Sequence, residues 1–165
     1  MREYFKRDEH CVVTSINNVF IQAGYASSAS GFAALTAAYI DAIGAKVSQK
    51  EMSCLARLGS GRATRSIHGG FVVWHQGDSH ETSYAEQIPI DWPEFRMLLT
   101  IIDSGAKRIS SRIGMQISVE KAPSYDIYVR ESNALVEPMI EGLKKYEIDT
   151  VGRIAERSAE LMRNV

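Results

Sequence analysis

Apolar residues recur at helical spacing in four separate segments of this 165-residue chain, and this periodicity does most to limit the possible fold. The first segment begins at Ser27 and ends at Gly44, and the others begin near Ser48, Val136 and Val151. Their stripes are three and four residues apart, which places each stripe on one face of a helix. We therefore expect four helices, two of them at the C-terminal end.

β-Branched and aromatic residues fill the segments outside these helices. Cys11–Ile16 ("CVVTSI") favours a short strand, and "GFVVWHQGD" favours a strand that turns at Gly77–Asp78 and returns through "ETSYAEQIPI". The nearly continuous apolar run "FRMLLTIID" is typical of a buried strand. Strands in the middle of the chain and helices at its end predict an α+β fold.

Several local signals mark helix ends. Ser48 and Glu51 form a capping box, Gly44 ends the first helix, and Asp149 is a candidate N-cap of the last one. Between glycines, "GSGRATRSIHGG" has room for one short helix.

The charge and the cysteines limit the possible partners and compartment. A formal net charge of −1 gives no electrostatic reason to expect nucleic acid or an anionic membrane as a partner. No apolar stretch is long enough to span a bilayer, and no apolar region of a secretory signal follows Met1–Glu9. Cys11 and Cys54 form no CxxC motif and are expected to be reduced thiols. We therefore expect a cytoplasmic protein.

The stretch "AGYASSASGF" places small residues immediately before the first helix. The first turn of a helix has unpaired N–H groups and a positive dipole end, so it attracts anions. Small residues let a phosphate approach this backbone, and serine hydroxyls add donors. The stretch is not a P-loop, because no lysine follows its last glycine. A helix cap with a tight turn remains the alternative.

Two further stretches carry basic and hydroxyl side chains. Arg62 and Arg65 are three residues apart, hence on one face of a helix, and guanidinium groups bind phosphate and carboxylate oxygens in pairs. In "KRISSRIG", Ser110, Ser111 and Arg112 follow the expected buried strand, where chain ends often carry sites. A solvated basic face and an ordinary basic loop are the respective alternatives.

A cluster in the expected hairpin imitates metal ligands without a recognised spacing. It consists of His75, Asp78, His80 and Glu81, and we interpret it as a solvent-exposed turn, so no metal-binding residues are predicted. Met115 is either a core residue or a pocket-lining residue.

Taken together, three motifs resemble the mevalonate diphosphate decarboxylase branch of the GHMP kinase superfamily. "SINNVFIQAGYASSASGFAAL" is similar to a family segment with an Asn-Asn pair, Gly-Leu-Ala-Ser-Ser-Ala and an alanine-rich helix. "ARLGSGRATRSIHGGFVVW" resembles its Gly-Ser-Gly-Ser-Ala-x-Arg-Ser-x-x-Gly-Gly-Phe segment, and "ISSRIGM" resembles a third motif. Their order and spacing match the family over nearly the whole chain.

The resemblance implies a GHMP-kinase-like α+β fold that is incomplete at both ends. Residues 1–92 would be part of the N-terminal nucleotide-binding domain, which is like domain 2 of ribosomal protein S5. Residues 93–165 would be part of the C-terminal domain. The resemblance also implies that the protein is a homodimer. It implies phosphorylated mevalonate as the small-molecule substrate, and ATP and Mg²⁺ as cofactors.

The resemblance also assigns site residues. Arg65 would act in catalysis, near the substrate carboxylate. ATP would be held by Ser15, Asn17, Gly24, Ala26, Ser27, Ser28 and Ser30. The substrate would be held by Ser60, Arg62, Arg65, Ser111, Arg112 and Met115.

The implied reaction is the ATP-dependent decarboxylation of mevalonate 5-diphosphate to isopentenyl diphosphate in isoprenoid biosynthesis. Three departures from the family pattern bear on this reaction. Arg62 occupies a position where the family usually has serine. This sequence also has no counterpart of the family's N-terminal Lys-Tyr-Trp-Gly-Lys-like segment, or of the catalytic aspartate in its Asp-Ala-Gly-Pro-Asn-like loop. The isolated chain is therefore expected to bind ATP weakly and to turn over little. The alternatives are a mevalonate kinase-like or phosphomevalonate decarboxylase relative, and a nucleotide-binding module without catalysis.

Overall fold

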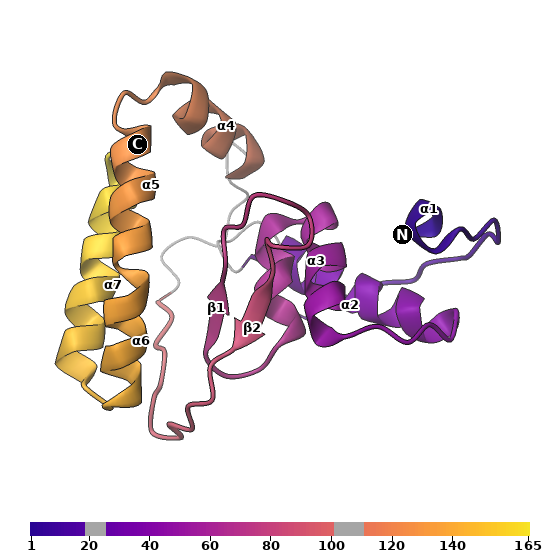
Figure 1. Ribbon diagram of the computed structural model, residues 1–165, viewed down its shortest axis with the longest axis horizontal. Coiled ribbons are helices and arrows are strands. Elements are labelled where there is room, and N and C mark those ends of the chain that lie inside the picture. Colours follow the sequence, from indigo (N-terminus) through magenta and orange to yellow (C-terminus); the bar gives the residue numbers. More distant parts are fainter. Residues whose placement is uncertain (19–25, 101–110) are drawn as a thin grey trace. The chain divides into compact units, whose positions relative to one another are not determined.

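A computed structural model describes residues 1–18, 26–100 and 111–165 of the chain (Figure 1). Contacts between Cα atoms divide the chain into two compact units. The first unit contains Met1–Pro89, and the second contains Ile90–Leu98 and the C-terminal helices. Each unit buries apolar residues of its own, Ala33 and Leu55 in the first and Leu143 and Val151 in the second.

Helices and a two-stranded antiparallel sheet form the first unit. The strands pair Val72 with Gln87 and Trp74 with Ala85, and Gly77 takes the left-handed conformation (φ +61°) in the connection between them. The predicted hairpin is thus confirmed. In chain order the elements are α1 (Arg2–Phe5), α2 (Ser27–Ala42), α3 (Gln49–Gly59), the 3₁₀-helix η1 (Gly61–Ile67), β1 (Val72–Trp74) and β2 (Ala85–Gln87).

The ends of α2 and α3 follow the local signals in the sequence. Ser48 caps α3, because its hydroxyl accepts a hydrogen bond from the N–H of Glu51 at 3.1 Å. Gly44 follows α2 with φ +64°, and its N–H and that of Ala45 bond carbonyls of the last turn. The Ser48 cap and the glycine stop are confirmed, whereas the Glu51 carboxylate of the expected capping box accepts a hydrogen bond from the Tyr4 hydroxyl.

Small side chains form the centre of the first unit. Ala33 of α2, Ala56 of α3 and Ala63 of η1 make one buried cluster, against which Ile67 packs. Alanine lets three helices approach closely, and at Gly59 even a methyl group would lie 2.2 Å from the ring of Phe32. Small residues at these contacts therefore let α2, α3 and η1 pack closely against one another.

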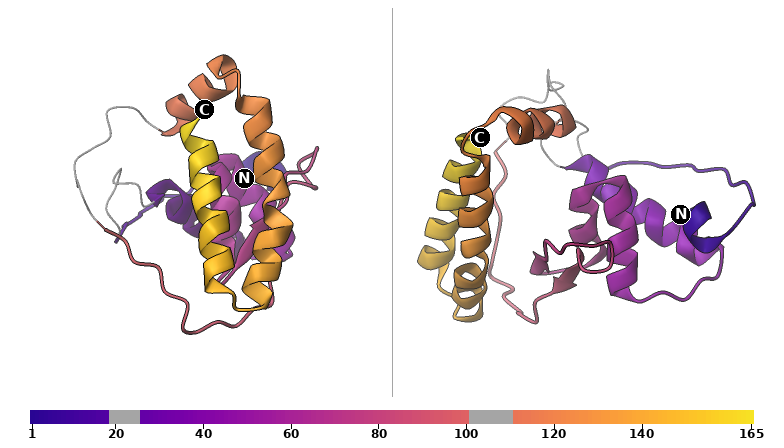
Figure 2. Two further views of the ribbon diagram at one scale, coloured as in Figure 1. Left: turned by 90° about the vertical axis from the view of Figure 1, so that its left-hand side faces the viewer. Right: turned by 45° about the horizontal axis from the view of Figure 1, so that its top comes forward.

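Four helices form most of the second unit: α4 (Ser111–Lys121), α5 (Tyr125–Ala134), α6 (Val136–Lys144) and α7 (Ile148–Arg163). In both views of Figure 2, α5 and α6 form one arm that runs beside α7. The arm is interrupted after Ala134 because Pro138 has no N–H to donate to the Ala134 carbonyl. Ser124 Oγ, before α5, donates to the Asn164 carbonyl, after α7, so the two arms are antiparallel.

A left-handed residue makes the turn between the arms. Tyr146 has φ +58°, and the N–H groups of Tyr146 and Glu147 bond the carbonyls of Leu143 and Gly142. The Tyr146 ring meets Trp92 edge-on at 5.2 Å, and its hydroxyl donates to the Asp91 carbonyl. These contacts attach residues 90–92 to the helical hairpin.

Two predicted strands are wrong where the structure describes them. Cys11–Ile16 has no regular structure, and Val12 and Ile16 are 96% and 86% exposed. The described part of "FRMLLTIID", residues 95–100, is likewise irregular, and Leu98 is 92% exposed. Neither segment has a partner strand among the described residues, and β-branched composition alone does not make a strand without a neighbour.

The helices at the C-terminal end also differ from the sequence-based prediction. The helices from Val136 and Val151 are confirmed, although α7 begins one turn earlier. Its N-cap is Glu147, and Asp149 lies within the first turn, so the Asp149 N-cap is wrong. Helix α5 and the helical part of "ISSRIGMQ" were not predicted, because their apolar spacing is weak. Among the described helices, none is long and apolar enough to cross a membrane.

Candidate functional site

Two of the predicted phosphate-binding segments meet in the first unit. Ser28 Oγ, in the first turn of α2, lies 3.4 Å from Ser60 Oγ, the residue between α3 and η1. These serines are 32 residues apart in the chain. At this pair of hydroxyl groups, a residue predicted to bind the nucleotide therefore lies next to a residue predicted to bind the substrate.

The N-terminal end of α2 carries no compensating charge. Its first turn contains no acidic residue, and its N-cap, Ala26, has φ +51° and no side chain able to accept a hydrogen bond. Nearby, Ser30 Oγ and Asn17 Nδ2 donate to the Ser27 carbonyl at 3.0 and 3.4 Å. The positive dipole end of a 16-residue helix is thus framed by serine and asparagine side chains.

Arg62 and Arg65 stand together on η1. In a 3₁₀-helix, residues three apart eclipse one another, so the two guanidinium groups share an edge. Within the described residues, neither arginine forms an ion pair or a side-chain hydrogen bond, and both are exposed. Partial desolvation, together with the charge of Arg62, lowers the pKa of Arg65. Two neighbouring cations without a counter-charge are groups of the kind that bind anions.

The remaining predicted residues lie elsewhere or outside the described part. Ser15 is exposed in the irregular segment before residue 19, and its side chain makes no hydrogen bond to another described residue. Gly24 lies outside the described residues, as do the side chains of Ser111 and Arg112 on α4. Met115 lies on α4 in the second unit and is 60% exposed.

The hairpin residues that imitate metal ligands are engaged with other groups. His75 Nε2 lies 2.9 Å from Glu86 Oε1, and Arg57 Nη2 lies 3.2 Å from His80 Nδ1. Asp78 Oδ1 accepts from the Thr82 hydroxyl. No group of three or more potential metal ligands occurs within residues 1–18, 26–100 and 111–165.

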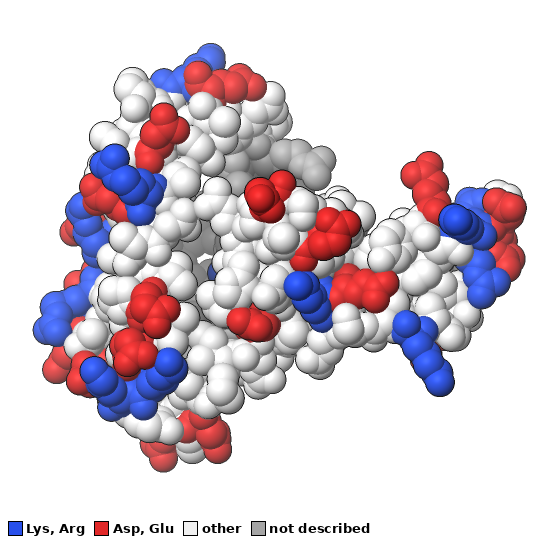
Figure 3. All heavy atoms as spheres, in the orientation of Figure 1, with Lys and Arg blue, Asp and Glu red and all other residues white. Residues whose placement is uncertain are grey.

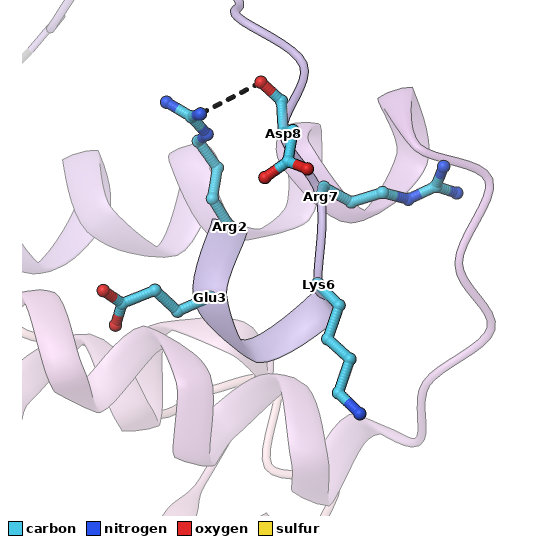
Figure 4. A pocket seen from close by; sticks show the side chains of 5 residues that line it. All are labelled: Arg2, Glu3, Lys6, Arg7 and Asp8. Carbon is cyan, nitrogen blue, oxygen red and sulfur yellow. Dashed lines mark hydrogen bonds between the residues drawn. The ribbon is translucent and has the colours of Figure 1, made fainter.

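A hollow beside α1 is separate from these residues. Figure 4 shows its lining, in which the Arg2 guanidinium donates to the Asp8 carbonyl. Its other lining residues are Glu3, Lys6 and Arg7, so charges of both signs surround it and no predicted site residue does. Acidic and basic side chains are likewise interspersed over the face in Figure 3.

The sequence does not reveal Ser53 or Phe32 as supports of the site. Ser53 is fully buried on α3, where it bonds Thr64 of η1, and the Phe32 ring covers Gly59 just before Ser60. A serine within the buried stripe of a helix is the only local signal for the first. Nothing local signals the second.

Comparison with known proteins gives consistent results. The family model for the diphosphomevalonate decarboxylase-like N-terminal domain matches residues 1–85. The diphosphomevalonate decarboxylase of Ganoderma lucidum is 41% identical over 115 residues, which are 67% of this chain and 29% of that protein. That of Candida albicans is 35% identical and covers 83% of this chain and 38% of its own length. The chain thus spans well under half of these curated relatives.

Solved structures show the same relationship. Mevalonate diphosphate decarboxylase from Enterococcus faecalis is 36% identical with a TM-score of 0.71, over 87% of this chain and 44% of that one. The enzyme from Staphylococcus aureus is 33% identical with a TM-score of 0.73, over 85% and 43%. Another structure, described as MDDEF in complex with MVAPP, AMPPCP and magnesium, is 38% identical with a TM-score of 0.74, over 87% and 45%. The α+β fold expected for a GHMP kinase is therefore confirmed for the part that is present.

Proposed function

The chain belongs to the diphosphomevalonate decarboxylase-like family, and from this premise we propose that it contributes to the ATP-dependent decarboxylation of mevalonate 5-diphosphate to isopentenyl diphosphate. The observation that carries the proposal is the 3.4 Å contact between Ser28 and Ser60. This contact brings the N-terminus of α2, which has no acidic residue in its first turn, next to Ser60, which precedes the Arg62 and Arg65 of η1. The transfer of a phosphoryl group between two anionic molecules requires positive groups of this kind near both molecules.

The α2 side of the site fits the phosphates of ATP. Backbone N–H groups at the start of α2 and hydroxyls around them are donors of the kind that bind phosphate oxygens. Mg²⁺ binds mainly through phosphate oxygens and water in such sites, so it would arrive with the nucleotide. The residues we assign to this side are Ser15, Asn17, Gly24, Ala26, Ser27, Ser28 and Ser30.

The η1 side fits the phosphorylated acid. We assign Ser60, Arg62 and Arg65 to it, with Ser111, Arg112 and Met115 as further substrate residues by resemblance. In the proposed reaction the tertiary 3-hydroxyl is phosphorylated, phosphate leaves and CO₂ is lost. Arg65 stabilises the negative charge that develops on the departing phosphate and orients the carboxylate, which is the catalytic role of a fixed guanidinium.

Titration calorimetry on the 165-residue chain tests this proposal with MgATP and with mevalonate 5-diphosphate. We expect weak, saturable binding of both and little release of CO₂. Arg65→Gln should weaken binding of the diphosphate about 10- to 100-fold, because it removes charge-assisted hydrogen bonds. Arg153→Gln is the matched control, since Arg153 is an exposed arginine bonded to Thr150 on α7. Absence of binding to any phosphorylated ligand would contradict the proposal.

Arg62 supports a second candidate, a relative that acts on a differently phosphorylated mevalonate. A long guanidinium beside Arg65 changes both the charge and the space available where the family usually has serine. Comparing mevalonate, its 3-phosphate, 5-phosphate and 5-diphosphate as ligands of the wild type and of Arg62→Ser distinguishes the two candidates. Preference for the diphosphate in both proteins favours the first candidate, whereas a preference that changes with Arg62 favours the second.

We further propose a cytoplasmic location and a homodimer. The unpaired state of Cys11 and Cys54 supports a reducing compartment. Light scattering coupled to size exclusion measures the mass in solution, and a monomer at all concentrations would contradict the dimer.

A further inference from the structure

A buried serine connects three elements beneath the arginine pair. Ser53 of α3 lies 2.6 Å from Thr64 Oγ1 and 3.0 Å from the Thr64 carbonyl of η1. It also accepts a hydrogen bond from the N–H of Ala85, the first residue of β2, at 2.8 Å. All three residues are 0% exposed. We call these residues the hydroxyl clamp.

The positions of the protons in this clamp follow from the chemistry of its groups. The Thr64 carbonyl can only accept, so the Ser53 hydroxyl donates to it. The Ala85 N–H can only donate, and the Thr64 hydroxyl then donates its proton to Ser53 Oγ. Ser53 thus makes one donated and two accepted hydrogen bonds, which is the full capacity of a hydroxyl. Every group is satisfied in one arrangement, so the clamp defines one position for Thr64.

That position decides where the arginines point. Thr64 lies between Arg62 and Arg65 on η1, and with three residues per turn its inward direction places both arginines on another edge. Two more contacts hold η1 at its ends: Trp74 lies against Gly61, and His68 Nε2 bonds the Ala85 carbonyl at 2.9 Å. Thus η1 is attached to the hairpin at its start and end, and to α3 in the middle.

An opposing force makes the middle attachment important. Arg62 and Arg65 repel one another and have no counter-ion within the described residues. Short 3₁₀-helices have poorer hydrogen-bond geometry than α-helices, so repulsion between eclipsed side chains tends to unwind them. The clamp resists this because moving Thr64 leaves buried donors unpaired.

We propose that the hydroxyl clamp of Ser53, Thr64 and Ala85 is a positioning device for the anion site, which holds Arg62 and Arg65 in register for one phosphorylated ligand. The inference rests on the proposed function of the arginine pair. Thr64 and Ser53 are positioning residues, since neither reaches the ligand from its buried place.

Two substitutions at one position separate positioning from simple stability. Thr64→Val keeps the shape and removes the hydroxyl, whereas Thr64→Ser keeps the hydroxyl and removes a methyl group. Each should lower the melting temperature slightly. In Thr64→Val, Ser53 still accepts from Ala85 and donates to the carbonyl of residue 64, so no buried donor is left unpaired and the variant should fold. It loses the bond between the two hydroxyls, which is the contact that fixes the side chain of residue 64, so η1 is held there by a single main-chain bond.

The measurement is the affinity for inorganic pyrophosphate, by calorimetry on the 165-residue chain, with melting temperatures measured in parallel. We expect Thr64→Val to weaken binding about five- to tenfold and Thr64→Ser to stay within about twofold of the wild type. Equal affinities in the two variants, with Arg65→Gln still weakening binding, would overturn the clamp alone. A folded wild type that binds no pyrophosphate would overturn the proposed function and the clamp with it.

Discussion

The arginines of η1 and those of α7 are held in opposite ways. On α7, Arg157 pairs with Glu131 of α5 and with Glu160 one turn away, and Arg153 bonds Thr150. On η1, Arg62 and Arg65 are three residues apart and have no acidic partner within residues 1–18, 26–100 and 111–165. This lack of an acidic partner is consistent with the anion site that we propose for η1.

The space around a glycine also differs between the two regions. Gly59, ahead of η1, has the Phe32 ring 2.2 Å from where a Cβ would stand, whereas Gly152 of α7 has open space. We expect Gly59→Ala to destabilise the chain by about 1–3 kcal/mol through overpacking. Gly152→Ala should stabilise it by about 0.5–1 kcal/mol through helix propensity. Urea unfolding of both variants measures the difference, and equal effects would remove this contrast between the two regions.

Charge removal should have effects of opposite sign in the two regions. At low ionic strength, Arg65→Gln relieves repulsion and should raise the free energy of unfolding by about 0.3–0.5 kcal/mol. Arg157→Gln breaks an exposed ion pair and should lower it by a similar amount. Adding salt should diminish both effects. A loss of stability in Arg65→Gln would show that the pair has a counter-charge.

The smallest expected effect is a titration in the second unit. Lys144 donates to Glu141 at 2.9 Å and lowers the pKa of that carboxyl below the ordinary value of a glutamate. A depressed folded pKa contributes stability above the unfolded value, and this contribution disappears as the pH falls through the folded value. NMR titration of Glu141 should show its pKa rising in Lys144→Gln. An unchanged pKa would mean that the pair is not formed in solution.

Signals that act within a few residues predicted the structure well. The Ser48 cap of α3 and the stop at Gly44 after α2 each depend on bonds within a single helix end, and both are present. The shared face of Arg62 and Arg65 follows from a spacing that holds for α- and 3₁₀-helices alike. The ends of these elements were therefore readable from neighbouring residues.

Features that need a distant partner were not readable. Cys11–Ile16 has the composition of a strand but no strand beside it among the described residues. Ser53 finds Thr64 and Ala85 at separations of 11 and 32 residues, and nothing in the sequence specifies that meeting. The arginine pair was predicted from its own spacing, whereas the clamp beneath it emerged only from the tertiary structure.

The alanine cluster of α2, α3 and η1 has a consequence for how the site responds to a ligand. Ala33, Ala56 and Ala63 have no rotatable side-chain bonds, so the platform beneath the arginines has no alternative rotamers to adopt. The buried centre beneath η1 therefore cannot adjust by changing rotamers, whereas the exposed Arg62 and Arg65 side chains can. In the proposed site, the main chain would stay fixed while the two arginine side chains adapt to the ligand.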